Sequence, residues 1–247
     1  MKSIGLVGFG RFGKLLYKQL KDRTEFNIYD PDKITQQKQE NIPFCKLEQV
    51  CRKSLIILAV PVSAIMEITA KISDLVSPET IVMDVCAVKQ YPLKVLQNRL
   101  PSDIQIIGTH PLFGPDSVQK TMEGHLMIIS PQRISLKNMK LFRDFWEGLG
   151  IRLIEMEPED HDRLIAWTLG LTHFLGRALK QLPLPDAAIA TRDYQNLIHL
   201  TEKINRDTWE LFEDMHRYNP FTVEMRRQLL QSLNSLKDKL DAADFRS

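Results

Sequence analysis

A glycine motif directly after a short apolar run near the start of the chain constrains the fold more than any other feature. The run Ser3–Val7 is typical of a β-strand, and Gly8-Phe9-Gly10-Arg11-Phe12-Gly13 follows it in the pattern G-x-G-x-x-G, leading into a helical pattern at 12–20. In this context the first glycine permits a tight turn, the second lets the backbone approach a pyrophosphate, and the third lets helix and strand pack closely. The phosphates would bind at the helix N-terminus, where free N–H groups and the helix dipole favour anions. The motif therefore predicts a dinucleotide-binding domain, with these six residues as cofactor contacts.

Short β-like runs alternate with helical patterns through residues 1–155. The expected strands are 3–7, 26–29, 55–60, 80–84, 104–108, 126–129 and 152–155, and the expected helices are 12–20, 64–75, 92–99 and 136–149. Such alternation is typical of a mostly parallel sheet covered on both faces. We therefore predict that residues 1–155 form an NAD(P)-binding domain of the Rossmann type.

The pattern changes after Pro158. Three segments, 159–182, 193–215 and 220–241, have helical periodicity with almost no strand signal, and prolines separate them. Helices of this length cannot bury their apolar faces alone, so they should pack on the α/β domain, on one another or on a second subunit. We predict an all-helical C-terminal domain over residues 156–247.

Composition excludes several classes of protein. The formal net charge is +2 over 247 residues, which is too small to indicate binding to nucleic acid or to an anionic membrane. The three cysteines are an odd number without C-x-x-C spacing, so neither a disulfide framework nor a zinc site is expected, and no metal is predicted. The first apolar run is too short for a signal peptide, and no apolar stretch reaches the ~18 residues of a membrane-spanning helix. We expect a soluble protein of the reducing cytoplasm.

An aspartate at the end of the second expected strand indicates which dinucleotide is bound. The carboxylate of Asp30 can accept hydrogen bonds from both ribose hydroxyls of NAD, and it would repel the 2′-phosphate of NADP. Arg11 and Lys33 are nearby cations that could still accommodate a 2′-phosphate. The alternative is a turn aspartate before Pro31. We expect NAD in preference to NADP.

One histidine follows the apolar run 104–107. The segment Gly108-Thr109-His110-Pro111-Leu112-Phe113-Gly114-Pro115 surrounds it with prolines and glycines, which predicts a rigid turn at the edge of the sheet. Imidazole suits a general base because its ordinary pKa lies near neutral pH. The alternative is a loop with a solvated histidine.

Five segments together resemble the prephenate/arogenate dehydrogenase family, the last three its plant-type arogenate branch. They are Asp84-Val85-Cys86-Ala87-Val88-Lys89; Thr109-His110-Pro111-Leu112-Phe113-Gly114-Pro115-Asp116-Ser117; Glu159-Asp160-His161-Asp162-Arg163; Thr172-His173-Phe174-Leu175-Gly176-Arg177; and Tyr194-Gln195-Asn196-Leu197 leading to Asp207-Thr208-Trp209-Glu210-Leu211. The resemblance spans nearly the whole chain in the expected order.

The resemblance implies an oxidative decarboxylation. Prephenate would give 4-hydroxyphenylpyruvate, or arogenate would give tyrosine, as hydride passes from the ring to the nicotinamide and carbon dioxide leaves. His110 has the position of the family's catalytic histidine and would accept the proton of the ring hydroxyl. It must be neutral to do so, which predicts that activity falls as the pH drops through its pKa.

The resemblance also implies the substrate-binding residues. His173 has the position of the family's substrate-binding histidine, and Arg177 one turn later can meet a carboxylate bidentately. The alternative for Arg177 is a surface arginine that covers apolar neighbours. Thr191 matches a threonine that contacts the substrate, and Arg192 replaces a lysine of the plant-type branch. Asp207 is near a position where an acid is associated with arogenate, whose ammonium it could favour.

Further cofactor contacts are expected at strand ends. Val60 and Pro61 end one expected strand, and Lys89 follows another at Asp84, near the position of the nicotinamide. Asp84 or Lys89 could instead merely cap the next helix. His161 lies twelve residues before His173, a rotation of about 120° at ~100° per residue. We therefore interpret His161 as an interdomain or capping histidine. We interpret the remaining histidines, His125, His199 and His216, as surface or packing residues.

The chain departs from the family beside its expected base. Ala87 replaces a serine whose hydroxyl is expected to bond the substrate 4-hydroxyl. Losing such a hydrogen bond costs ~1–3 kcal/mol, or roughly 5- to 150-fold in rate. Cys86, Thr109 or a water could compensate. Otherwise the protein is slow, acts as an oxidoreductase on another small carboxylate, or is a catalytically silent NAD-binding homologue.

Two expectations concern anchoring and assembly. The bacterial-type arginine of the family's third helical segment has no clear counterpart, and Leu200 falls near its place. The helical domain is expected to mediate a homodimer, as is usual in the family.

Overall fold

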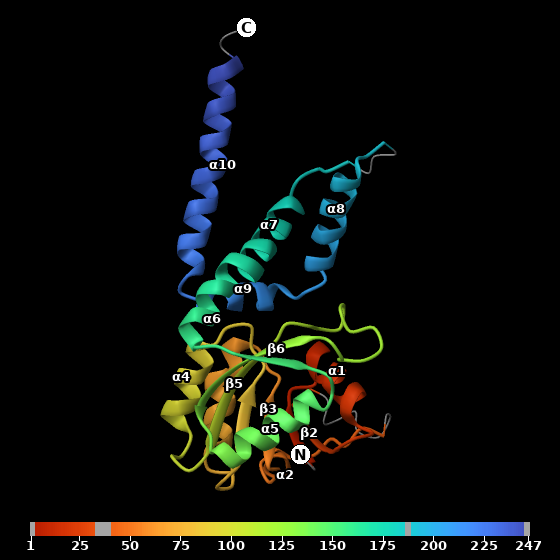
Figure 1. Ribbon diagram of the computed structural model, residues 1–247, viewed down its shortest axis with the longest axis vertical. Helices are drawn as coiled ribbons and strands as arrows, with labels where there is room; N and C mark the ends of the chain where they lie inside the picture. The colour runs from red at the N-terminus through yellow and green to blue at the C-terminus, as the bar shows by residue number, and fades with distance from the viewer. Residues whose placement is uncertain (1–2, 33–40, 186–188, 245–247) are drawn as a thin grey trace. The chain divides into compact units, whose positions relative to one another are not determined.

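The computed structural model describes residues 3–32, 41–185 and 189–244. The chain forms two compact units, Met1–His161 and Asp162–Ser247 (Figure 1). Lys33, expected as a cation near the cofactor, lies outside the described residues.

The first unit is built on one seven-stranded sheet with the order β2-β1-β3-β4-β5-β6-β7. The strands are β1 Ser3–Val7, β2 Glu25–Tyr29, β3 Leu55–Leu58, β4 Ile81–Asp84, β5 Gln105–Pro111, β6 Leu126–Arg133 and β7 Arg152–Glu155. All neighbouring pairs are parallel except β5 and β6, so the predicted mostly parallel sheet is confirmed.

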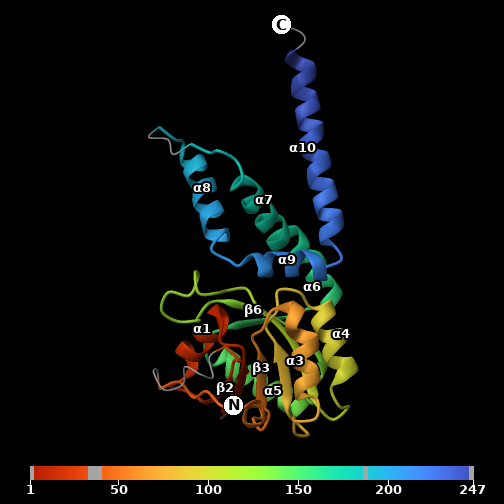
Figure 2. The same cartoon turned by 180° about the vertical axis from the view of Figure 1, so that it is seen from behind.

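Helices cover both faces of this sheet. They are α1 Arg11–Leu20, the short α2 Leu47–Val50, η2 Val62–Ala64, α3 Ile65–Ile72, α4 Gln90–Arg99 and α5 Leu136–Glu147. Helix α5 lies in front of the sheet in Figure 1, and α3 lies in front in the reverse view of Figure 2. Every residue of β3 and β4 is consequently buried, which explains their continuous apolar sequences. The four residues of α2 have no clear helical period, and no helix was predicted there.

Strand β5 is longer than the sequence indicated. The predicted strand ends at Gly108, followed by a turn around His110. In the structure the strand continues through Pro111, and His110 is paired with Ile128 of β6. The turn prediction was wrong because antiparallel pairing with β6 carries β5 past Gly108, and glycine and proline signals do not reveal such a partner.

The second unit is helical. Its elements are α6 Pro158–Ile165, which begins in the first unit, the π-helical segment η3 Ala166–Gly170, α7 Leu171–Leu179, α8 Arg192–Ile204, α9 Trp209–Tyr218 and α10 Thr222–Asp244. Helices α7 and α8 lie side by side in both views, and a Cβ at Gly176 would approach Ile204 Cδ1 to 2.9 Å (Figures 1 and 2). Among the described residues, no helix has both the length and the apolar sequence needed to cross a membrane.

The predicted helix 193–215 is two helices. The Thr208 hydroxyl accepts a hydrogen bond from Leu211 N at 3.1 Å and begins α9, whereas α8 ends at Ile204. Threonine is a favoured N-cap, so the break has a local cause. The prediction of one helix was wrong because apolar residues before the break, such as Leu200 and Ile204, and after it, such as Leu211 and Met215, share one helical period.

Candidate active site

The glycine loop joins β1 to α1. Its three glycines differ in how much space each has for a side chain. Gly8 has φ +96°, and a Cβ there would lie 2.3 Å from the Ala59 carbonyl oxygen. A Cβ at Gly13 would lie 2.2 Å from the Gly8 carbonyl oxygen. Gly8 and Gly13 are therefore required by the protein's own packing. A Cβ at Gly10 would meet no atom within 4 Å, so this part of the loop is open to a ligand.

Asp30 at the end of β2 bonds the glycine loop directly. Phe9 N donates to Asp30 Oδ2 at 2.7 Å, and Asp32 N donates to Asp30 Oδ1 at 3.0 Å. Each carboxylate oxygen can accept a further hydrogen bond. The Phe9 ring is buried and packs edge-on against Tyr17 and Phe44. Asp30 thus keeps acceptor capacity beside the glycine loop, whereas the Phe9 side chain packs in the core.

Two motif side chains contact the segment after β5. Arg11 Nη2 lies 2.5 Å from Asp116 Oδ2, in a partly exposed ion pair. The Phe12 ring packs against Phe113 at 6.2 Å between centroids. The first helix is thereby joined to the segment that follows His110.

The ends of β1 and β3 form a topological switch point of the sheet. These strands are neighbours, yet the chain leaves β1 for β2 on one side and β3 for β4 on the other. Ligands of open α/β sheets bind at such a point, beyond the carboxyl ends of the strands. Half-buried Val60 and exposed Pro61 lie directly after β3 at this point.

A buried polar cluster follows β4. Lys89 Nζ bonds Asp84 Oδ2, and both side chains have no exposed surface. Cys86 N donates to the same oxygen at 3.0 Å. Within the described residues Asp84 Oδ1 is buried and has no hydrogen-bond partner. Lys89 occupies the N-cap position of α4, but its side chain makes no capping bond there.

His110 is buried near the end of β5, with 6% of its surface exposed. Its Nδ1 lies 2.9 Å from Nε2 of His161, and the two rings are steeply inclined, at 75°. Burial lowers the pKa of His110 well below 6.5, with smaller contributions in the same direction from His161 and Lys89. His110 is therefore neutral at neutral pH, as a general base must be.

His161 is a site residue whose contact with His110 the sequence did not predict. It is buried in α6, with 1% of its surface exposed, and its backbone N–H donates to Glu157 O at 2.9 Å. The interpretation as an interdomain or capping histidine missed this contact, because the helical rotation compared His161 only with His173. The pairing depends on where α6 meets β5, which no local sequence pattern reveals.

The surroundings of Ala87 limit what could replace the missing hydroxyl. Thr109 Oγ1 donates to Asp84 O at 2.5 Å and is fully buried, so its proton is engaged. The Cys86 thiol lies 3.9 Å from Val60 O. Of the two side chains expected to compensate, Thr109 is committed to the protein backbone.

In the helical unit, three of the five expected substrate residues lie together. His173 Nε2 is 3.9 Å from Asp207 Oδ2. Arg177 Nη2 donates to Asp207 O at 2.6 Å and to Thr208 O at 3.1 Å, and its guanidinium lies over the Trp209 ring. These contacts favour a structural role for Arg177 over direct binding of substrate, because they hold the connection between α8 and α9.

His173 keeps an unused polar atom within this cluster. Its Nδ1 and Arg177 Nε are buried, with no hydrogen-bond partner among the described residues. Burial lowers the pKa of His173; Asp207 opposes this shift and Arg177 adds to it. The neutral ring can therefore donate or accept one hydrogen bond to a ligand.

The other two expected substrate residues lie at the far end of α8. The Thr191 hydroxyl accepts from Tyr194 N at 3.3 Å and caps the helix, and Arg192 begins it. The 13 residues of α8 span about 20 Å, so Thr191 and Arg192 are separated from Asp207 by the length of the helix.

His216 has a packing environment. Its Nδ1 lies 2.9 Å from Arg226 NH1, and its ring contacts Phe174 and Phe212. Burial first, then Arg226 and His173, lower its pKa to about 4. His216 is therefore a neutral acceptor for Arg226 at neutral pH.

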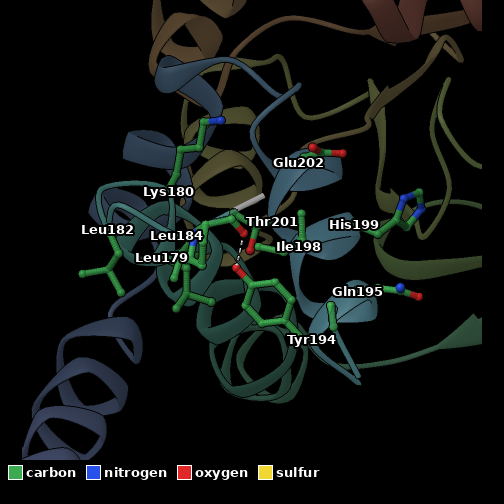
Figure 3. Close-up of a pocket in the computed structure, with 12 residues that line it drawn as sticks. Leu179, Lys180, Leu182, Leu184, Tyr194, Gln195, Ile198, His199, Thr201 and Glu202 are labelled. Atoms are coloured by element: carbon green, nitrogen blue, oxygen red, sulfur yellow. Dashed lines mark hydrogen bonds between the residues drawn. The ribbon is translucent and has the colours of Figure 1, made fainter. Parts of the chain in front are cut away.

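A hollow of about 540 Å³ lies between the end of α7 and α8 (Figure 3). Leu179, Leu184 and Ile198 contribute its apolar wall, and Tyr194 Oη donates across it to Pro185 O at 2.7 Å. None of the expected site residues lines it. Although the hollow is large, we therefore do not assign it as the reaction site.

Two family models match the chain. Residues 18–155 match the model described as "Prephenate dehydrogenase, nucleotide-binding domain", and residues 178–246 match "TYRAAT1-like, C-terminal domain". Among solved structures, prephenate dehydrogenase from Aquifex aeolicus, crystallised with hydroxyphenyl propionate and NAD+, has a TM-score of 0.77 at 24% identity, covering 97% of this chain and 91% of that one. Synechocystis arogenate dehydrogenase has a TM-score of 0.69 at 22% identity, covering 97% and 93%. At these identities the two structures support the fold.

Curated relatives are similar over much of this chain. Arogenate dehydrogenase 1, chloroplastic, of Arabidopsis thaliana is 28% identical over 96% of this chain and 39% of its own length. Arogenate dehydrogenase 2, chloroplastic, of the same plant is 31% identical over 65% and 46%. The chain thus spans less than half the length of these two relatives. Since the first family model covers more than half of the chain, including the strand that carries His110, this chain belongs to the prephenate/arogenate dehydrogenase family.

Proposed function

We propose that this chain catalyses the NAD-dependent oxidative decarboxylation of arogenate to tyrosine, or of prephenate to 4-hydroxyphenylpyruvate, in tyrosine biosynthesis. The observation that carries the proposal is a buried, neutral His110 on a strand whose carboxyl end lies at the same edge of the sheet as the glycine loop. This edge is where a nucleotide and a base have to meet in a dehydrogenase of this fold.

The residues of the sheet edge fit NAD. Gly10 leaves room for a pyrophosphate at the start of α1, and Asp30 keeps acceptor capacity for the ribose hydroxyls. Val60, Pro61 and Lys89 follow neighbouring parallel strands at the same edge. When bound, NAD supplies the hydride acceptor. The carboxylate of Asp30 disfavours a 2′-phosphate, so we propose NAD in preference to NADP.

His110 would act as the base. It accepts the proton of the ring 4-hydroxyl while the hydrogen on the same carbon leaves with its two electrons. The bond to the ring carboxylate then breaks, carbon dioxide leaves, and its electron pair makes the ring aromatic. The proton held on His110 returns to the phenolate oxygen, so His110 ends neutral and ready for the next turnover.

Residues of the helical unit are expected to bind substrate. We propose that His173 gives a hydrogen bond to a substrate carboxylate and that Asp207 pairs with the ammonium group of arogenate. Arg177 holds the connection that carries Asp207, through its bonds to the backbone there. Thr191 and Arg192 stay predictions from the sequence, and the contact seen for Thr191 is a helix cap.

We further propose two domains, with residues 1–155 binding the nucleotide and residues 156–247 binding substrate and forming a homodimer. Helix α10 supports the dimer. Leu233, Leu236 and Leu240 recur at spacings of three and four residues and are 49%, 57% and 59% exposed. Such a stripe is the seam that a second helix buries in a coiled coil. Light scattering should give the mass of two chains, and a monomer would contradict this part of the proposal.

We place the protein in the cytoplasm as a further proposal. Within the described residues, Cys45 and Cys51 form no disulfide bond, which suits a reducing compartment. Fluorescence of a tagged full-length protein, followed in intact cells, tests this location.

NADH absorbance tests the function. The protein is mixed with NAD or NADP and with arogenate or prephenate, in all four combinations. We expect NADH formation with at least one substrate and a clear preference for NAD. Binding of NAD without turnover of either substrate would contradict the proposal, and a preference for NADP would contradict the role of Asp30.

A further inference from the structure

Two buried histidines face each other at the end of β5. His110 Nδ1 and His161 Nε2 are 2.9 Å apart, and 6% and 1% of their surfaces are exposed. We propose that His161 is a positioning residue that fixes the tautomer of His110, so that Nε2 of His110 is the unprotonated nitrogen that takes the substrate proton. This inference rests on the proposed role of His110 as the base.

Two neutral imidazoles can bond each other in only two ways. Each neutral ring carries one N–H and one bare nitrogen, so a bond between them needs one donor and one acceptor. If His110 Nδ1–H donates, His110 Nε2 is bare and can accept a proton. If His161 Nε2–H donates instead, His110 Nε2 already carries its proton and cannot act as a base.

The first arrangement is also the one that survives the reaction. When His110 Nε2 takes the substrate proton, both nitrogens of that ring carry hydrogen. The bond from Nδ1–H to His161 Nε2 then remains and stabilises the imidazolium. The second arrangement would have to break and reverse before any proton could be taken. His161 must therefore present a bare Nε2, with its own proton on Nδ1.

The chemical nature of the partner distinguishes this pair from a histidine oriented by a carboxylate. A carboxylate beside imidazole favours the charged ring, whereas a neutral imidazole orients it without adding negative charge. Burial, His161 and Lys89 all lower the pKa of His110, so its ring is neutral before it takes the substrate proton. The contact with His161 therefore orients the base without raising its pKa.

Two substitutions separate this role from simple packing. His161→Gln keeps an acceptor near the position of Nε2, because the amide oxygen accepts a hydrogen bond at similar reach. His161→Leu fills much of the space without any acceptor. A packing role predicts that Leu is tolerated at least as well as Gln in the 1%-exposed site. A tautomer-fixing role predicts the opposite order for turnover.

The direct test is ¹⁵N NMR of the full chain labelled on histidine, without substrate or nucleotide. His110→Asn and His161→Gln spectra assign the two rings. We expect a protonated Nδ1 and a bare Nε2 on His110, and a bare Nε2 on His161. A His110 ring with its proton on Nε2 would overturn the inference, whatever the effect of either substitution on turnover.

The second experiment measures turnover by the two His161 variants. We expect His161→Leu to lower kcat roughly 10- to 100-fold, the effect of losing an orienting hydrogen bond to a reacting group, and His161→Gln to recover most of it. The KM for NAD should stay unchanged in both. Equal kcat values for the two variants would overturn the inference. Failure of the unmodified chain to turn over either substrate would instead overturn the proposed function, and the NMR pattern would then decide the inference by itself.

Discussion

The two units hold their candidate site residues in different ways. In the α/β unit, Asp30, Asp84 and His110 each lie at or next to the carboxyl end of a parallel strand, and the sheet itself brings them to one edge. In the helical unit, Asp207 lies in a short connection that Arg177 holds through two backbone carbonyls. Position at the end of a strand therefore points to candidate site residues from sequence, whereas the role of a histidine or threonine on a helix depends on neighbours that the sequence does not reveal.

The largest expected effect belongs to the sheet edge. Replacing His110 with asparagine removes the base, and general bases contribute roughly 10²- to 10⁴-fold to rate. We expect kcat to fall within that range while the Kd for NAD is unchanged. Steady-state kinetics and a nucleotide titration measure the two quantities.

His199→Asn is the matched control, because His199 is exposed on α8. It should keep the unmodified kcat. Loss of turnover in both variants, or in neither, would contradict the claim that the histidine at the strand end acts in catalysis and the one on the helix surface does not.

The second prediction concerns the missing hydroxyl. Ala87→Ser introduces the hydroxyl that the family resemblance implies at this position, and Thr109 is not available to replace it. We expect kcat to rise, by up to roughly 5- to 150-fold if the hydrogen bond is fully regained. An unchanged kcat with intact NAD binding would mean that another group already performs this task.

The third prediction compares two glycines of one loop. Gly13→Ala would place a Cβ 2.2 Å from the Gly8 carbonyl, and overpacking of this kind typically costs ~1–3 kcal/mol of the free energy of unfolding. Gly10→Ala meets no atom within 4 Å, so its stability should be unchanged while its affinity for NAD falls. Urea denaturation and NAD titration of both variants test this. Equal stability losses would contradict the assignment of Gly10 to the ligand.

The smallest expected effect belongs to the helical unit. Arg177→Lys keeps the charge but loses the planar donor set that reaches Asp207 O and Thr208 O. We expect the free energy of unfolding to fall by ~1–2 kcal/mol, with a modest rise in the KM for the cyclohexadienyl substrate. A large rise in KM without any loss of stability would instead make Arg177 a direct substrate ligand.

Much of the α/β unit was predictable from sequence because its signals are local. The apolar runs, the glycine loop and Asp30 each depend on a few adjacent residues, and parallel pairing then brings the strand ends together. The extension of β5 through His110 was not predictable, because it depends on antiparallel pairing with β6.

The helical unit was less predictable for a related reason. Thr191 and His173 both fit a family pattern, yet α8 separates Thr191 from the cluster of His173, Arg177 and Asp207. The break at Thr208 and the contact of His161 with His110 depend on capping and on packing between elements. Periodicity along one segment carries neither kind of information.

The dependence of kcat/KM on pH tests the central claim most directly, because a base acts only while it is neutral. The pKa of His110 is lowered, so the ring stays neutral as the pH falls through 6.5, and protonation begins only at lower pH. We therefore predict a kcat/KM, measured by NADH formation with NAD and the preferred substrate, that is level at pH 6.5 and falls in more acidic solution. This acid limb should be absent from the residual activity of His110→Asn. The same acid limb in both proteins would contradict the assignment of His110 as the base.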